Sequence, residues 1–225
     1  MAKILVYNNA TNKMETYYRG DNDRMPYNVG NTLTVKEFRA RSRSNLLWTD
    51  RKTMETWNAF RKFYGKVIPI GACFRRPWED GHGKQSQHYA GTAFDTGQAL
   101  PVAQREKLRA AAHKFGKWTY VEPKSISPTW VHTDKRYGKP ACSAGYPVLS
   151  FGSHGNYVCL LQDALNALGF VVGHPDGIFG NKTMNEVKSA QRAYSLSQTG
   201  IVDCATWQAI VKRAVGIGKT GTVIG

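Results

Sequence analysis

The sequence predicts an α+β protein in which strands and helices mix over residues 1–140 and helices alone fill residues 148–213. Three observations lead to this prediction. Residues 3–18 hold two alternating apolar and polar runs around an Asn-rich turn, a pattern typical of a β-hairpin. Residues 54–64 repeat large apolar side chains at helical spacing. Residues 148–213 carry an internal repeat in which a Gly-Ile turn leads each time towards a helix.

Shorter signals place the other elements of the first part. Thr34 and Glu37 form a capping box, which predicts that a helix begins there. An apolar run indicates a buried strand, and a longer segment with three consecutive alanines indicates a helix. The elements expected on these grounds are a strand at 67–74, a helix at 100–115, and strands at 118–121 and 129–134.

The repeat in the second part pairs residues 177–183 with residues 200–206 at one constant offset. In each copy the turn leads to a Thr that is suited to cap the next helix, and Thr183 with Glu186 forms a second capping box. Another helix over 158–168 precedes the repeat, so the expected unit has three helices. The expected boundaries are a first domain at 1–140 that opens with a hairpin at 1–30, a linker at 141–147, a helical domain at 148–213 and a flexible tail at 214–225.

The net charge limits the partners of the chain. The 225 residues include 31 Lys and Arg against 16 Asp and Glu, which gives +15 and favours polyanions such as nucleic acids or phosphate-rich wall polymers. No basic and aromatic recognition motif supports a nucleic acid, so we expect none as a partner. No run of about 18 apolar residues is present, so we expect no membrane span.

The start of the chain and its cysteines bear on location. Residues 1–9 contain only a short apolar patch, and no small-residue cleavage pattern follows it. We therefore expect synthesis in the cytoplasm, with action elsewhere only after release. The four cysteines show no CxxC spacing, and free thiols are the default expectation in a chain without a secretory signal.

Two segments hold residues suited to bind a metal ion. Residues 86–95 read Ser-x-His-x-x-Gly-x-Ala-x-Asp and offer His88 and Asp95, and a later Trp-Val-His run offers His132. Two imidazoles and one carboxylate bind Zn²⁺ while leaving a position open for water. A closed structural zinc site usually has four ligands with several thiolates, and no cysteine is near either His in the sequence. The segments therefore predict a catalytic zinc site.

Other side chains near these ligands are candidates for catalysis and substrate binding. Because side chains alternate along a strand, Trp130 and Asp134 are expected on the same face as His132. Asp134 could then orient a ligand or accept a proton. Arg75, at the end of a strand, is suited to hold a substrate carboxylate through two hydrogen bonds. We expect Ser86 and Trp130 to contact the substrate together with Arg75.

These residues closely resemble the zinc D-alanyl-D-alanine peptidases, the VanY-like group that includes carboxypeptidases and bacteriophage endolysins. The resemblance covers roughly residues 30–137. It rests on the Phe-Arg-Arg-Pro run at 74–77, the motif at 86–95 and the Trp-Val-His run at 130–132. It implies an α+β fold with helices packed on a small, largely antiparallel sheet. The resemblance also implies that His88, Asp95 and His132 bind zinc and that Arg75 contacts the peptide substrate.

One position departs from the pattern of that family. Many members place an acid, usually Glu, three residues before the last His ligand, where this sequence has Thr129. Asp134 or the more distant Glu122 could replace this acid as the general base. We expect Asp134 to be the proton acceptor for zinc-bound water, with Glu122 as the alternative.

The second part resembles a peptidoglycan-binding domain of the three-helix type. The resemblance covers about residues 148–213 and rests on the runs at 160–170, 176–180 and 199–203. Both parts then point to the same polymer, and we expect an endolysin-like peptidoglycan hydrolase that cleaves stem peptides with zinc-activated water. The alternative is a catalytically inactive, zinc-containing wall-binding protein. The expected partners are peptidoglycan and anionic wall polymers, and the expected state is a monomer. Which peptide bond is cut stays open.

Overall fold

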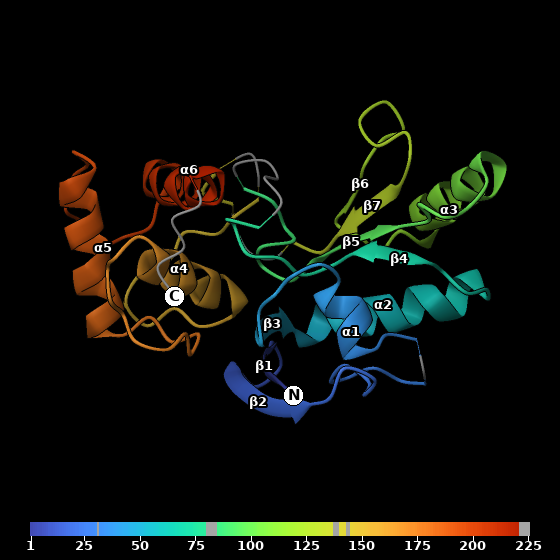
Figure 1. The fold of residues 1–225 in the computed structure, drawn as a ribbon, viewed down its shortest axis with the longest axis horizontal. Helices are drawn as coiled ribbons and strands as arrows, with labels where there is room; N and C mark the ends of the chain where they lie inside the picture. The colour runs from blue at the N-terminus through green and yellow to red at the C-terminus, as the bar shows by residue number, and fades with distance from the viewer. Residues whose placement is uncertain (31, 80–84, 137–139, 143–144, 221–225) are drawn as a thin grey trace.

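The computed structural model describes residues 1–30, 32–79, 85–136, 140–142 and 145–220 (Figure 1). Strands and helices follow one another in the first 136 residues, and helices alone follow. The α+β class predicted from the sequence is confirmed. The elements are β1 (Ala2–Asn8), β2 (Lys13–Arg19), α1 (Val35–Arg39), β3 (Leu46–Asp50), α2 (Arg51–Tyr64), β4 (Ile70–Ala72), β5 (Ala93–Thr96), α3 (Val102–Phe115), β6 (Tyr120–Val121), β7 (Val131–Asp134), α4 (Asn156–Ala167), α5 (Asn181–Ala193) and α6 (Cys204–Thr220).

The first sheet has the strand order β2-β1-β3. The predicted hairpin is confirmed, since β1 and β2 pair antiparallel from Ala2 opposite Arg19 to Asn8 opposite Lys13. β1 also pairs in parallel with β3, a strand that the sequence analysis did not predict. This central position explains why Ile4 and Val6 are fully buried. The hairpin therefore supplies two of the three strands of this sheet, and the third strand, β3, comes from later in the chain.

The second sheet carries the candidate site. Its order is β4-β5-β7-β6 and every neighbouring pair is antiparallel, as the resemblance implied. Helices α2 and α3 pack on one face, where the rings of Trp57 and Phe94 stack with centroids 4.5 Å apart. Because side chains alternate along a strand, Asp95 points away from these helices. The opposite face of the sheet is thus left for polar side chains.

Several helix and strand predictions are confirmed with shifted ends. The helix expected at 54–64 is α2, which begins earlier because the carboxylate of Asp50 accepts a hydrogen bond from the Thr53 backbone N–H, 2.9 Å away. The capping box of Thr34 and Glu37 is present at the start of α1. The strand expected at 67–74 is shorter, with only the three residues of β4 in the sheet.

The C-terminal module, residues 148–220, contains α4, α5 and α6. Gln162 and Gln191 occupy corresponding places in it. Gln162 donates to the hydroxyl of Thr183 at 3.2 Å, and Gln191 donates to the hydroxyl of Thr206 at 3.1 Å. The expected capping box at Thr183 is wrong, because α5 begins after Gly180 and Thr183 lies within its first turn. The hydroxyls of Thr183 and Thr206 therefore accept hydrogen bonds from buried Gln side chains, and neither Thr caps a helix.

Three features of the structure differ from what the sequence led us to expect. Tyr146 lies in the expected linker but is fully buried, and its hydroxyl donates to the Ser86 carbonyl at 2.7 Å. Cys142 and Cys204 form a disulfide, so the expectation of free thiols holds only for Cys73 and Cys159. Residues 214–220, expected as the start of a flexible tail, form the end of α6, and residues 221–225 lie outside the described range.

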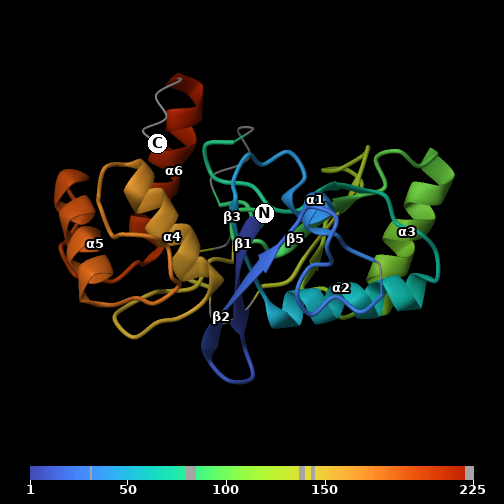
Figure 2. The same ribbon diagram turned by 60° about the horizontal axis from the view of Figure 1, so that its bottom comes forward.

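The modules lie side by side in space. Figures 1 and 2 show α4, α5 and α6 gathered at one end, the first sheet in the middle, and the second sheet with α2 and α3 at the other end. The side chain of Arg76 forms an ion pair with Asp163 of α4, with Nη2 and Oδ1 2.6 Å apart. Among the described residues, no helix is both long and apolar enough to cross a membrane.

Candidate metal centre

Antiparallel pairing brings two of the three predicted ligands together. Asp95 on β5 lies directly opposite His132 on β7, so their side chains share the face of the sheet that α2 and α3 leave open. His88 comes from a turn between β4 and β5. One ligand atom from each of His88, Asp95 and His132 lies within 4.8 Å of the others, and we name these three residues the metal cluster. The structure therefore brings all three predicted ligands together.

The ring of His88 has a fixed orientation. Its Nδ1 lies 2.6 Å from the carbonyl oxygen of Cys73, which can only accept, so Nδ1 carries the proton and donates. The other ring nitrogen, Nε2, faces Oδ2 of Asp95 at 3.2 Å. The side chain is 2% exposed, so the surrounding chain and not solvent sets this orientation. A backbone partner of this kind is typical of zinc-binding histidines.

The ring of His132 lies between two carboxylates. Its Nδ1 is 2.7 Å from Oδ1 of Asp95, and its Nε2 is 3.3 Å from Oδ2 of Asp134. Arg136 donates to both oxygens of Asp134, from Nε and Nη2 at 2.8 Å each. Because a carboxylate oxygen only accepts, both ring nitrogens of His132 donate in this arrangement, and loss of the Nδ1 proton would leave the Nδ1 lone pair facing Asp95 and His88.

The charges at the cluster favour a cation. Burial alone would raise the pKa of Asp95, but the adjacent His88 and His132 hold it well below its usual range. Burial alone would lower the pKa of His132, but hydrogen bonds to Asp134 and Asp95 outweigh it and raise the pKa to about 9. Both shifts show that positive charge is stabilised between these groups. Two imidazole nitrogens and a carboxylate fit Zn²⁺, with a fourth position left for water.

The two candidates for the general base have different surroundings. Asp134 is fully buried, and both of its oxygens accept hydrogen bonds from Arg136. The backbone N–H of Glu122 donates to the His132 carbonyl at 3.0 Å, so Glu122 continues the β6 and β7 pairing opposite His132. Glu122 therefore belongs to the face that carries the cluster and is partly exposed. The surroundings suit Asp134 to orienting His132, and its role as proton acceptor stays a prediction.

The predicted substrate contacts are Arg75, Ser86 and Trp130, and each forms a hydrogen bond in the segments that carry or adjoin His88 and His132. The Arg75 N–H donates to the His88 carbonyl at 3.4 Å, and the Arg75 side chain is largely buried. The Ser86 hydroxyl accepts from the His88 N–H at 3.3 Å and so helps to shape the turn. The Trp130 carbonyl accepts from Arg109 at 2.7 Å. Roles of these three side chains in substrate binding stay predictions.

Two arginines support the site: a pairing of Asp134 with Lys135 or Arg136 was one expectation from the sequence, whereas Arg109 was not expected. Arg136 locks Asp134. Arg109 of α3 donates to the carbonyls of Glu122, Ser127 and Trp130 at 2.6 to 2.7 Å. It thereby holds the loop between β6 and β7 from within, and no local sequence pattern marks it.

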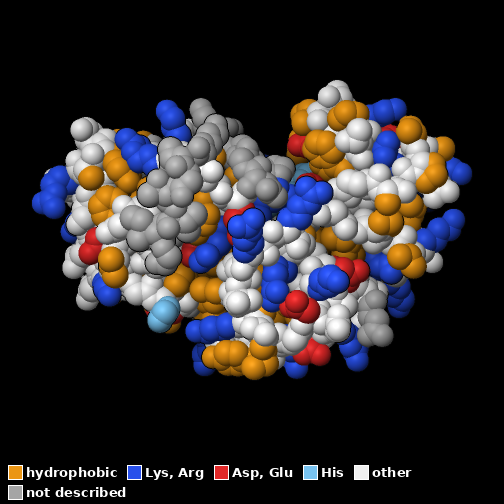
Figure 3. All heavy atoms as spheres, viewed as in Figure 1, with side chains coloured by type: hydrophobic (Ala, Val, Ile, Leu, Met, Phe, Trp, Pro, Cys, Tyr) orange, Lys and Arg blue, Asp and Glu red, His pale blue; other side chains and the backbone are white. Residues whose placement is uncertain are grey.

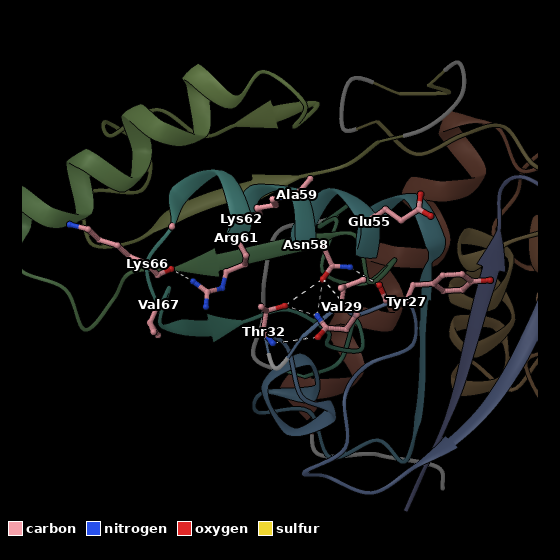
Figure 4. Close-up of a pocket in the computed structure, with 12 residues that line it drawn as sticks. Tyr27, Val29, Thr32, Glu55, Asn58, Ala59, Arg61, Lys62, Lys66 and Val67 are labelled. Carbon is pink, nitrogen blue, oxygen red and sulfur yellow. Dashed lines mark hydrogen bonds between the residues drawn. The ribbon is translucent and has the colours of Figure 1, made fainter.

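A separate pocket of about 860 Å³ lies between α2 and the loop before α1 (Figure 4). Asn58 of α2 joins the two walls, since it donates to the Tyr27 carbonyl at 2.5 Å and accepts from the Thr32 hydroxyl at 3.4 Å. The residues that line this pocket include none of the three residues of the metal cluster. Figure 3 shows many Lys and Arg side chains on the face towards the viewer.

Comparison with known proteins identifies the C-terminal module. Residues 154–210 match the family described as "Putative peptidoglycan binding domain". A solved peptidoglycan-binding protein from Clostridioides difficile, in complex with glutamine hydroxamate, shares 40% sequence identity with this chain over the matched part. That match covers 30% of this chain and 42% of the other, with a TM-score of 0.29. The chain thus spans less than half the length of that relative. The protein carries a peptidoglycan-binding domain, and peptidoglycan is the ligand class that this domain indicates.

Proposed function

We propose that this protein is a zinc-dependent peptidase that cleaves peptide bonds in the stem peptides of peptidoglycan. The observation that carries the proposal is the convergence of His88, Asp95 and His132 in a chain that also holds a peptidoglycan-binding domain. A binding domain in the same chain keeps the site at a high local concentration of wall substrate. The endolysin-like setting, in which the enzyme reaches the wall after release from the cell, belongs to the same proposal.

The residues of the site have different proposed roles. His88, Asp95 and His132 would hold the zinc ion, and bound zinc would supply a water of lowered pKa and polarise the substrate carbonyl. Asp134, fixed by Arg136, holds His132 in the orientation that presents Nδ1. We assign Arg75 to the carboxylate or carbonyl groups of the stem peptide, because guanidinium groups bind both.

One proton acceptor is needed beside the cluster. Besides the ligand Asp95, the carboxylates of Asp134 and Glu122 share the face of the sheet with His132. Glu122 is better suited to exchange protons with water because it is partly exposed, whereas Asp134 already accepts two hydrogen bonds from Arg136. We therefore propose Asp134 for orientation and Glu122 for proton transfer.

The alternative is a wall-binding protein that holds zinc without catalysing hydrolysis. The observation that favours it is Thr129, which stands where related peptidases carry an acid. The two functions can be distinguished by incubating purified cell-wall sacculi with three preparations of the protein. These are the zinc-loaded protein, the protein stripped of zinc by a chelator, and the stripped protein reloaded with zinc. We expect newly released amino groups with the first and third preparations only. Equal wall binding by all three without any release would support the inactive alternative.

A further inference from the structure

The turn that presents His88 belongs to no strand or helix. This turn, residues 86–91 and named the His88 turn, is shaped by short backbone hydrogen bonds. The Tyr89 N–H donates to Ser86 at 3.0 Å, and the Gly91 N–H donates to His88 at 3.1 Å. Because no ladder of strand hydrogen bonds holds the turn, the place of His88 depends on the groups that pack around it.

One side of the His88 turn rests on β3. Trp48 donates from its indole Nε1 to the Tyr89 carbonyl at 2.8 Å, and the Thr49 hydroxyl donates to the Gly91 carbonyl at 2.7 Å. Gly91 has a φ of +68°, and a Cβ at this position would lie 1.9 Å from the Trp48 carbonyl oxygen. Only glycine fits such an approach, so the turn is pressed against β3.

The other side of the His88 turn is held by the C-terminal module. Asn156, the first residue of α4, donates from Nδ2 to the Ala90 carbonyl at 2.7 Å. The hydroxyl of Tyr157, the next residue, donates to Oε1 of Gln87 at 2.7 Å. Asn156, Tyr157 and Gln87 are each at most 5% exposed. Two buried side chains of the peptidoglycan-binding module thus complete the hydrogen bonds of the turn that carries a metal ligand.

A second contact ties α4 to the segment on the far side of His88. Arg76 binds both oxygens of Asp163, with hydrogen bonds of 2.9 and 2.6 Å. The neighbouring Arg75 donates its N–H to the His88 carbonyl. Helix α4 therefore contacts the chain both at the turn and at the segment that the turn leans on.

We propose that Asn156 and Tyr157 are positioning residues for the metal cluster, so that the peptidoglycan-binding module is a structural part of the zinc site. This inference rests on the proposed zinc site. A buried carbonyl that loses its donor is costly, and the turn would shift to regain one. A small shift of the His88 turn moves Nε2 away from Asp95 and His132. Loss of groups that orient metal ligands typically lowers metal affinity about 10- to 100-fold.

The test uses the full-length protein with single substitutions. Tyr157→Phe removes one hydroxyl, and Asn156→Ala removes the donor to Ala90. Tyr194→Phe is the matched control, because its ring packs on Phe170 within the module, away from the His88 turn. Zinc affinity is measured by competition with a chromophoric chelator, and the geometry of the cluster by the visible spectrum of the Co²⁺-loaded protein. Urea unfolding of the metal-free proteins reports whether each variant is folded.

We expect the zinc dissociation constant to rise about 10-fold or more in Tyr157→Phe and Asn156→Ala, with a changed Co²⁺ spectrum and normal wall binding. Tyr194→Phe should match the wild type. Wild-type affinity and spectrum in both variants would overturn the positioning role and leave the proposed function intact. A wild type that binds no zinc would overturn both. If Asn156→Ala fails to fold, Tyr157→Phe decides, because it changes a single hydroxyl.

Discussion

The two halves of the molecule place their polar side chains in opposite ways. In the C-terminal module each central glutamine bonds to a turn that follows it closely, with Gln162 and Thr183 21 residues apart and Gln191 and Thr206 15 residues apart. In the N-terminal half, Asp95 and His132 are 37 residues apart and meet only because β5 and β7 pair in one register. The module is built from local repeats, and the site from distant segments.

This difference governs how each half responds to change. A local repeat keeps its hydrogen bonds when distant parts of the chain move. The metal cluster needs the sheet register, the His88 turn and the contact with α4 all at once. Substitutions at the cluster should therefore remove zinc chemistry while wall binding persists.

Removal of a proposed metal ligand should have the largest effect and should affect hydrolysis without affecting wall binding. His88→Ala, Asp95→Ala and His132→Ala should each abolish wall hydrolysis and reduce bound zinc to near zero, because two remaining ligands hold zinc poorly. Sedimentation with sacculi should be unchanged in all three. His113→Ala is the control, since His113 is exposed on α3 and outside the cluster. Undiminished zinc in the three ligand variants, by elemental analysis, would refute the cluster.

The roles of the two carboxylates near His132 can be separated by affinity and turnover. Glu122→Gln should lower turnover about 10²- to 10⁴-fold, the range for a positioned proton acceptor, while zinc affinity stays normal. Asp134→Asn should instead weaken zinc binding about 10- to 100-fold, because the carboxylate that orients His132 is lost. The assignment would be reversed by two results together. Glu122→Gln would keep normal turnover, and Asp134→Asn would keep normal zinc affinity but lose turnover.

The disulfide tests how firmly the connecting segment is fixed to the module. Cys142 and Cys204 close a loop with a sequence separation of 62, for which chain entropy predicts about 4 kcal/mol of stabilisation. The double variant Cys142→Ser, Cys204→Ser should show this loss in urea unfolding of otherwise identical proteins. Reduction of the wild type should give the same midpoint as the double variant. Equal stability of oxidised wild type and variant would contradict a bond at this place.

The smallest predicted effect concerns the pH dependence of the contact between α4 and Arg76. Burial raises the pKa of Asp163 from 3.8 to about 6, against the opposing attraction of Arg76. The folded protein therefore binds more protons than the unfolded chain between pH 4 and 6, and its free energy of unfolding falls as the pH rises through this window. The change amounts to roughly 3 kcal/mol at most. Asp163→Asn should remove this slope in urea unfolding, and an unchanged slope would contradict the shift.

Local signals in the sequence were enough to predict much of the fold. The hairpin, α2, α3 and the alternation along β7 follow from apolar spacing within one segment, and the structure confirms them. The capping box of Thr34 was confirmed and that of Thr183 was wrong. The reason is that the Thr183 hydroxyl accepts a hydrogen bond from Gln162 and that the helix begins earlier, directly after Gly180.

Features that depend on distant contacts could not be predicted in the same way. The parallel pairing of β3 with β1 and the bond between Cys142 and Cys204 require knowledge of how the chain returns on itself. The residues of the metal cluster were expected from their types and the motif, and Arg136 was one expected partner of Asp134, whereas Arg109 was not expected. Nothing in the local sequence states that a Tyr of the binding module will bond to Gln87.

The most direct test of the central proposal is mass spectrometry of the fragments released from purified peptidoglycan by the zinc-loaded protein. The account predicts muropeptides with a hydrolysed peptide bond and intact sugars, formed with zinc and absent after chelation. The same data show which stem-peptide bond is cut. Intact stem peptides after prolonged incubation with a zinc-loaded protein that remains bound to the wall would contradict the peptidase and leave a wall-binding protein.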